Sequence, residues 1–402
     1  MIMPTWKDVM KFNLSDNPII FDLGGYMAEW TQIAKDYYPT AIVYVFEPVK
    51  KHYDIIYEKF KNDNNVKIFN FGLSDKNDKV KITLTGDSSS IHLIDDNSEE
   101  IELRDIRDFL LDNKIFKVDL IKINIEGEEY NLLEYLCSTP ELNIFENYLV
   151  QFHKFIDNYE VRRSNILNIV RKYYDIIFNY EMVFEGWSIK NTKKIGCIGD
   201  SHVSIFSNSE TIIELESLVD NERFTSYRMG SWLAYNLDKR VNEIKSVISQ
   251  MDEETILFCF GEIDCRSQVK KISEDNNKPY TEVIEDIVRN YFIMIDNITD
   301  KKILIHSITP ELVENPHHYY YKDHLEDFDC PRGTLCERKE YKEVFNNLVK
   351  NECELRNIGF INIYDMLETS KYKTHFYLDD IHLVPNNVKY MIKRALIEND
   401  NN

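Results

Sequence analysis

The stretch Lys194-Ile195-Gly196-Cys197-Ile198-Gly199-Asp200-Ser201-His202 predicts a buried strand that runs into a tight turn and then a helix. A serine on such a turn presents its hydroxyl with neighbouring backbone N–H groups free. Near the C-terminus, Leu378-Asp379-Asp380-Ile381-His382-Leu383 places an aspartate three residues before a histidine. One short turn can therefore supply a general base and the carboxylate that orients it. We expect Ser201, His382 and Asp379 to act as nucleophile, base and orienter.

The first half of the chain carries a different turn, in Pro18-Ile19-Ile20-Phe21-Asp22-Leu23-Gly24-Gly25. Its glycines allow the backbone to approach a ligand closely, and the N-terminus of a following helix stabilises negative charge. The next expected strand ends in Phe46-Glu47-Pro48, which puts an acid where a ribose diol would lie. The G-x-G-x-x-G pattern is absent, which disfavours NAD. These residues predict a nucleoside-cofactor site.

The bulk composition favours two domains. A chain of 402 residues is too long for one ordinary core. The net charge of −21 provides no basic field, so nucleic acid and anionic membrane surfaces are poor partners. Small neutral or cationic molecules fit better, and a homo-oligomer stays open. The sequence shows no signal pattern and no apolar run long enough to span a membrane, so we expect a cytoplasmic protein.

Strand-like runs alternate with helix-like stretches throughout, which predicts an α/β fold with parallel sheets and helices on both faces. A polar stretch near Ser188–Lys193 separates two such cycles, so we expect domains at 1–190 and 191–402. The polar segment Asp75–Asp96 is expected to form an excursion over the first active face. Pro316–Glu337 is expected to be a long loop with substrate contacts. The histidines of this loop, His317, His318 and His324, are expected to be solvated rather than to bind a metal. The same holds for Asp95 and Asp96 at the end of the excursion.

The run Val118-Asp119-Leu120-Ile121-Lys122-Ile123-Asn124-Ile125-Glu126-Gly127-Glu128-Glu129-Tyr130 carries the most specific signal of the first half. With Phe21–Gly25, Glu47 and Gln151-Phe152-His153, it resembles the FkbM family of S-adenosylmethionine-dependent O-methyltransferases, over roughly residues 15–185. The resemblance implies a Rossmann-like methyltransferase sheet with S-adenosylmethionine as cofactor.

Residue by residue, the resemblance implies that Asp22, Gly24 and Gly25 lie at the methionine moiety and that Glu47 holds the ribose hydroxyls. It also implies that Lys122, Glu126 and Glu129 shape the pocket for methyl transfer. An internal Lys122–Glu129 ion pair is the alternative for two of these residues. The sequence departs from the family pattern at Ala28, which replaces a glycine, and at Asn124, which replaces an acid beside the cofactor.

O-Methylation requires the protein to hold the reacting groups in line and to supply a base. We expect His153 to be that base, with Glu126 as its competitor. A histidine at the end of a strand can also serve only as a structural hydrogen-bonding group.

The second half resembles the SGNH (GDSL-like) hydrolases, over about residues 193–397, in the order of that family's sequence blocks. The blocks are Gly199-Asp200-Ser201-His202, then Gly261-Glu262-Ile263-Asp264, then Asp379-Asp380-Ile381-His382. The resemblance implies a flavodoxin-like three-layer α/β/α domain and a family of esterases, deacetylases and some acyltransferases. It also implies an oxyanion hole built from the N–H groups of Ser201 and Gly230.

One departure bears directly on activity. The family's third block is G-x-N-D, and Ile263 replaces the asparagine that donates to the oxyanion. Arg266 is a candidate replacement for the lost donor. Because Asp200 adjoins Ser201 and Asp380 adjoins Asp379, the identity of the triad acid stays open.

Together the two resemblances predict a bifunctional glycan-tailoring enzyme of polysaccharide biosynthesis. One domain would methylate a hydroxyl of a sugar or related small acceptor, and the other would remove or transfer an acyl group. The alternative is a single-activity methyltransferase whose second domain is catalytically idle and binds glycan or mediates assembly.

Overall fold

The computed structural model describes residues 6–83, 98–180, 183–207, 214, 218–298, 301–312, 330–379 and 381–400. The chain divides into two compact units, Met1–Asn191 and Thr192–Asp400. The division falls within the polar stretch Ser188–Lys193. Each unit is built on a largely parallel sheet with helices packed against it, so the α/β class expected from the sequence is confirmed.

The sheet of the first unit contains seven strands, of which only β10 runs antiparallel to its neighbours. Mainly apolar strands form its centre, where both faces are covered. In sheet order the strands are β3 (Val66–Phe69), β2 (Ile42–Phe46), β1 (Ile19–Leu23), β7 (Leu120–Ile123), β8 (Asn147–Val150), β10 (Phe184–Ile189) and β9 (Tyr174–Tyr180).

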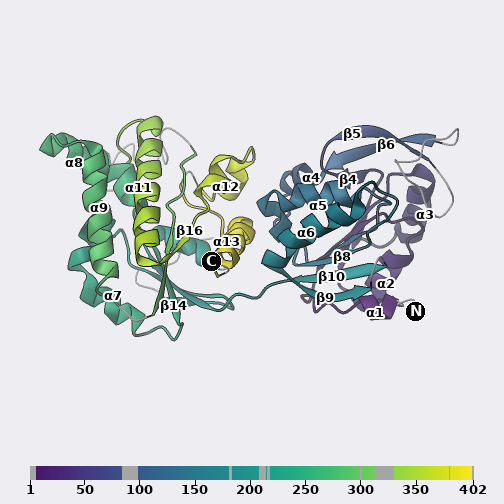
Figure 1. The fold of residues 1–402 in the computed structure, drawn as a ribbon, viewed down its shortest axis with the longest axis horizontal. Coiled ribbons are helices and arrows are strands. Elements are labelled where there is room, and N and C mark those ends of the chain that lie inside the picture. Colours follow the sequence, from purple (N-terminus) through teal and green to yellow (C-terminus); the bar gives the residue numbers. More distant parts are fainter. Residues whose placement is uncertain are drawn as a thin grey trace. The chain divides into compact units, whose positions relative to one another are not determined.

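Helices cover both faces of this sheet (Figure 1). One face packs against α1 (Trp6–Val9), α2 (Glu29–Tyr37) and α3 (Lys50–Phe60). The other faces α4 (Ile106–Asp112), α5 (Glu129–Cys137), the short η1 (Pro140–Ile144) and α6 (Tyr159–Tyr173).

Part of the segment expected as a polar excursion over the first active face contributes to a small second sheet. Its strand order is β4 (Gly72–Ser74), β6 (Ser98–Asp105) and β5 (Asp78–Thr83). The remainder of the excursion, with Asp95 and Asp96, lies outside the described residues. Val80, Ile82, Ile101 and Leu103 form an apolar cluster with Val49, which joins this sheet to the start of α3. The alternation of apolar and charged residues along β6 matches a strand with one covered face.

The sheet of the second unit has six strands, all parallel except the edge strand β12. The order is β12 (Leu218–Asp220), β13 (Phe224–Arg228), β11 (Ile195–Gly199), β14 (Thr255–Cys259), β15 (Lys302–His306) and β16 (Gly359–Ile361). Without β12 this is the 2-1-3-4-5 order of flavodoxin-like folds. The flavodoxin-like fold expected from the sequence is thereby confirmed.

In this unit most of the helices lie on one side of the sheet and the C-terminal helix lies on the other (Figure 1). The first side has α7 (Val241–Ile248), α8 (Val269–Asn276), α9 (Tyr280–Ile295) and α11 (Leu335–Arg356); the second has α12 (Tyr364–Glu368) and α13 (Pro385–Asp400). Shorter turns are η2 (Ser201–Phe206), η3 (Ala234–Lys239), η4 (Asp264–Gln268) and η5 (Lys373–Phe376), and η4 is a π-helix. Helix α11 begins with a capping box between Thr334 and Glu337.

In both sheets the strand order reverses beside the first strand of the unit. In open α/β sheets ligands bind at such switch points, outside the carboxyl ends of the strands. Gly24 and Asn124 follow β1 and β7 in the first unit, and Ser201 and Gly261 follow β11 and β14 in the second. The fold therefore places both predicted sites where it can host ligands.

Candidate active sites

Ser201, His382 and Asp379 come together in the second unit. The Oγ atom of Ser201 lies 2.8 Å from Nε2 of His382, and Nδ1 of His382 lies 2.9 Å from Oδ2 of Asp379. The other carboxylate oxygen of Asp379 accepts the backbone N–H groups of Ile381 and His382, at 2.8 and 2.7 Å. These bonds fix the direction of the carboxylate, which in turn fixes the tautomer and orientation of the imidazole.

The electrostatics suit a base and its orienter. Burial lowers the pKa of His382 and outweighs the opposing effect of Asp379, so the imidazole is neutral at physiological pH. Burial would raise the pKa of Asp379, but the hydrogen bond and charge of His382 and the two backbone donors hold it well below its usual range. The Asp379 carboxylate thus stays ionised beside a neutral imidazole that can accept a proton. Asp380, the alternative acid, lies outside the described residues.

Asp200 has a different role from a triad acid. It is fully buried, and its Oδ1 atom accepts from the backbone N–H of His202 at 2.8 Å and lies 3.0 Å from Nδ1 of the same residue. Asp200 therefore caps the turn that carries Ser201 and binds the neighbouring histidine.

The expected oxyanion donors lie at the carboxyl edge of the sheet. Ser201 opens η2, so its N–H has no acceptor within that turn. Gly230 follows β13 with φ of +85°, a conformation that favours glycine. Asp264 accepts from the backbone N–H groups of Ala234 and Tyr235, at 2.8 and 3.1 Å, and so holds the segment that follows Gly230.

The block Gly261-Glu262-Ile263-Asp264 contributes packing contacts and buried ion pairs beside the site. Gly261 has φ of +111°, and a Cβ atom there would lie 2.4 Å from the ring of Phe345 on α11. Ile263 is 2% exposed. Arg266, the candidate replacement donor, is buried with its Nε atom 3.1 Å from both carboxylate oxygens of Glu262.

The sequence did not reveal a buried charge network beside this site. Glu262 also contacts Nζ of Lys342 at 3.0 Å, and Lys342 lies 3.0 Å from Glu311, which pairs with Arg338 at 2.7 Å. No motif spacing connects these residues, because they come from the segments that follow β14 and β15 and from helix α11. Only the strand order, which places β15 next to β14, could have hinted at the pairing.

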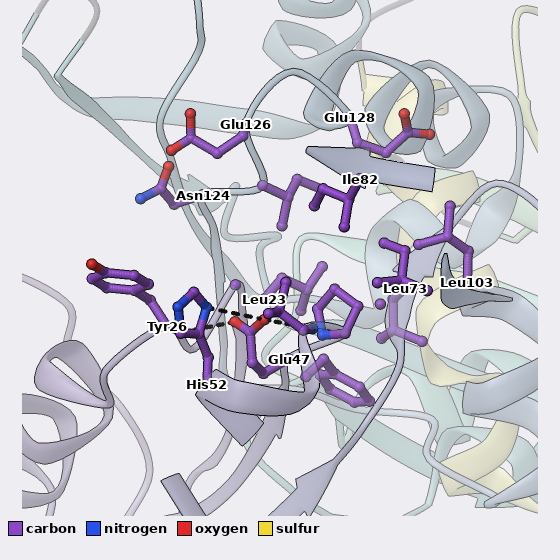
Figure 2. Close-up of a pocket in the computed structure, with 17 residues that line it drawn as sticks. Leu23, Tyr26, Glu47, His52, Leu73, Ile82, Leu103, Asn124, Glu126 and Glu128 are labelled. Carbon is purple, nitrogen blue, oxygen red and sulfur yellow. Dashed lines mark hydrogen bonds and ion pairs between the residues drawn. The ribbon is translucent and has the colours of Figure 1, made fainter. Parts of the chain in front are cut away.

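In the first unit a cavity opens at the carboxyl ends of β1, β2 and β7 (Figure 2). Glu47 lies in its wall; its Oε2 atom accepts from the N–H of Tyr26 at 2.8 Å and its Oε1 atom from that of Val49 at 2.9 Å. Burial raises the pKa of Glu47 to about 7. Ile82 and Leu103 of the small sheet form an apolar wall across the cavity from His52.

Gly24 and Asn124 also line the cavity. Gly24 has φ of +78°, and a Cβ atom there would lie 2.1 Å from the carbonyl oxygen of Asn124. Among the described residues, no partner is found for the buried Oδ1 atom of Asn124. Gly25, by contrast, is absent from the cavity wall; a Cβ there would meet Val45 and Ile56, so this glycine permits helix packing.

Asp22 and Lys122 do not line the cavity but form a buried ion pair beneath it. Nζ of Lys122 lies 2.9 Å from Oδ1 of Asp22 and donates to the carbonyl oxygens of Leu23 and Gly24, at 3.1 and 2.7 Å. Oδ2 of Asp22 accepts from Thr31 at 2.6 Å. Their contacts support the turn after β1 from behind.

The expected base of methyl transfer, His153, is held between two carboxylates. Its Nδ1 atom lies 3.0 Å from Glu129, and its Nε2 atom 3.5 Å from Glu126. Burial opposes protonation, but the two acids raise the pKa of His153 to about 9. At neutral pH the ring is therefore an imidazolium, which cannot accept a proton. Glu129 pairs with His153, so the alternative Lys122–Glu129 ion pair does not form.

Glu126, the competitor for the role of base, does line the cavity. Its backbone has φ of +52°, in the left-handed region that costs a residue with a Cβ atom about 1 kcal/mol or more. Gly127 follows with φ of +105°. The strained turn points Glu126 toward the cavity opening.

The described ranges hold neither a cluster of metal-ligating side chains nor a membrane-spanning helix. Within them, no group of three or more His, Cys, Asp or Glu residues could hold a metal ion. Nor does any helix in those ranges have the length and hydropathy to cross a membrane. His317, His318 and His324 lie outside the described residues.

A flavodoxin-like sheet with a serine, a histidine and an aspartate in contact at its carboxyl edge defines a class of α/β proteins with a serine-hydrolase type of site. A family model described as GDSL-like lipase/acylhydrolase matches residues 195–395. The chain belongs to the GDSL-like lipase/acylhydrolase family.

Several solved structures are similar to this chain. An FkbM methyltransferase from Methylobacillus flagellatus KT has 15% identity and a TM-score of 0.33, covering 46% of each chain, so less than half of that protein is matched. A lipase/acylhydrolase from Enterococcus faecalis has 16% identity and a TM-score of 0.31, covering 52% of this chain and 94% of that one. The aryl esterase of M. smegmatis has 13% identity and a TM-score of 0.32, covering 52% and 99%. No curated protein matches the chain.

Proposed function

We propose that the second unit is a serine esterase or deacetylase, in which Ser201 attacks an acyl carbon and His382 takes its proton. The contact of 2.8 Å between Ser201 Oγ and His382 Nε2 carries this proposal. The proton accepted by His382 then passes to the departing alkoxide, and a water molecule releases the acyl group by the same route. The N–H groups of Ser201 and Gly230 would stabilise the oxyanion.

A fluorophosphonate probe tests this function because it reacts only with an activated serine. The wild-type protein should label, Ser201→Ala should not, and the exposed Ser249→Ala should label as the wild type does. An unlabelled wild type would instead favour the idle, glycan-binding alternative that Ile263 suggests. If the wild-type protein labels, the unreacted enzyme can be given an acetyl donor in the presence of water and a sugar alcohol. Partition of the acetyl group between the two acceptors separates hydrolysis from acyl transfer.

A second function is proposed for the first unit, namely methyl transfer from S-adenosylmethionine to a hydroxyl group. When bound, this cofactor supplies an electrophilic methyl group. The cavity residues fit it: Glu47 keeps acceptor capacity for a ribose diol, Gly24 allows close approach, and Asn124 offers an unpartnered oxygen. Glu126, at the cavity opening, fits the role of the base that takes the acceptor's proton.

Calorimetric titration with S-adenosylhomocysteine tests the second function. Micromolar binding should be lost in Glu47→Ala and kept in Glu58→Ala, a substitution on the exposed face of α3. Absence of binding to the wild type would remove the cofactor assignment. A sugar or related glycan as the common acceptor is supported by the family resemblances, and acetylated and free sugars are the first compounds to screen with both activities.

A further inference from the structure

His202, the residue after the nucleophile, lies directly against the base. The rings of His202 and His382 stack with their centroids 4.7 Å apart and their planes at 26°. His202 is 5% exposed, whereas Ser201 is only half-buried. Two imidazoles in face-to-face contact influence each other's charge, because little solvent screens them.

Each edge of the His202 ring faces a buried acid. Its Nδ1 atom lies 3.0 Å from Oδ1 of Asp200, and its Nε2 atom lies 3.7 Å from Oε2 of Glu262. Although burial opposes protonation, these two carboxylates raise the pKa of His202. Both ring nitrogens therefore face a carboxylate, an arrangement that suits the imidazolium form, in which both nitrogens donate.

The Glu262 carboxylate is itself held by two basic side chains. Arg266 and Lys342 hold Glu262, and together with His202 they keep its pKa well below the usual range despite burial. The Cys259 thiol on β14 and the His306 ring on β15 line the same small pocket as His202. Burial lowers the pKa of His306 to about 4, so that ring is neutral. The carboxylates of Asp200 and Glu262 thus favour the protonated form of His202.

We propose that His202 is a positioning residue of the Ser201 site, a buried imidazolium clamped by Asp200 and Glu262 that stacks on His382 and governs how readily His382 takes and releases a proton. The inference rests on the proposed acyl chemistry. A cation against the ring disfavours a second cation there, so His382 stays neutral and able to accept the Ser201 proton at lower pH. Once protonated, His382 gives that proton more readily to a poor leaving group such as a sugar alkoxide.

The direct test is a titration of the histidine side chains by NMR, which needs no substrate. In His202→Gln the titration midpoint of His382, assigned with His382→Gln, should rise by about one pH unit or more. In His306→Gln, which removes a neutral ring next to the same region, the midpoint should stay within a few tenths of a unit. An unchanged midpoint in folded His202→Gln overturns the proposal.

A measurement on the wild type keeps the test independent of how well the variant folds. The ring nitrogens of His202 should both report the protonated form at pH 7. A neutral His202 at pH 7 overturns the proposal as well. If the wild type labels with fluorophosphonate, its pH–rate profile provides a further readout. The ascending limb of the profile should shift to higher pH in His202→Gln and stay at the wild-type pH in His306→Gln. If it does not label, the acyl function fails while the NMR result still decides the role of His202.

Discussion

The Oε2 atom of Glu47 accepts the backbone N–H of Tyr26 at 2.8 Å, so the acid in the cavity wall also fixes the turn after β1. His52 lies nearby, with its Nδ1 atom 3.9 Å from Oε1 of Glu47, but burial lowers its pKa and it provides no lasting positive charge. The ionisation of Glu47 therefore depends on burial above all, and its pKa rises to about 7.

Binding of S-adenosylhomocysteine should therefore weaken as the pH falls through neutrality. The pKa of Glu47 in the folded protein is raised, so the ionised acceptor for a diol is lost near pH 7 rather than near pH 4. We expect the affinity to fall by up to about tenfold per pH unit below 7. Calorimetry at three pH values measures this, with Glu47→Gln expected to bind weakly and without pH dependence. Equal wild-type affinity on both sides of pH 7 would contradict the assignment.

The buried ion pair of Lys122 and Asp22 should affect the free energy of unfolding more than the ion pairs on the surface of this unit do. Lys122→Met leaves Asp22 charged and unpaired in the core and removes two bonds to backbone carbonyls. Breaking a buried pair in this way costs about 3–5 kcal/mol. Urea unfolding should show that loss for the first unit, and the double variant Asp22→Asn with Lys122→Met should recover part of it. Additive losses would mean that the two residues act independently.

Two left-handed positions on the turn after β1 should differ in how well they tolerate substitution. Gly24→Ala introduces a Cβ atom 2.1 Å from the Asn124 carbonyl oxygen at positive φ, so we expect lost stability and lost cofactor binding. Ala28 has φ of +60°, so Ala28→Gly relieves about 1 kcal/mol of backbone strain but removes a buried methyl group. Its net effect should stay within about 1 kcal/mol. Thermal unfolding of both variants checks this, and a well-tolerated Gly24→Ala would be inconsistent with the close approach.

Asp264 should affect the esterase step through the segment that follows Gly230. Burial raises the pKa of Asp264 to about 7, and its carboxylate accepts two backbone N–H groups from that segment. Asp264→Asn replaces one acceptor by a donor that faces an N–H group. We expect kcat to fall by about tenfold to a hundredfold with little change in KM, because a displaced oxyanion donor acts mainly in the transition state.

The control for this prediction is Asp286→Asn, whose carboxylate lies on α9 and pairs with Lys278 and Arg289 near the surface. Its kinetics should match those of the wild type. A rise in KM at unchanged kcat in Asp264→Asn would place Asp264 in substrate binding instead.

The sequence predicted the parts of the fold that have a strong local pattern. Strands β1, β2 and β11 are mainly apolar runs that lead into glycine or acidic turns, and each lies where the sequence pattern predicts it. Strand β10 has no comparable sequence pattern, because Glu185, Gly186 and Ser188 interrupt its apolar residues. That glycine lies against the ring of Phe178 on β9, a contact that exists only once the strands pair.

At the sites, the sequence predicted residue types better than their roles. Lys122 was expected in the cofactor pocket and instead holds Asp22, because a lysine within a central strand must find its partners inside the protein. His153 was expected as a base, and only the structure reveals the two acids that keep it protonated. The contact of His202 with Glu262 joins distant segments and has no sequence signature.

The two units have separate hydrophobic cores, one built around Ile20, Val43 and Trp30 and the other around Ile198, Phe258 and Phe292. No residue belongs to both clusters. A mutation in one of these clusters therefore removes packing contacts within its own unit. Heating should produce two calorimetric transitions, one for each core.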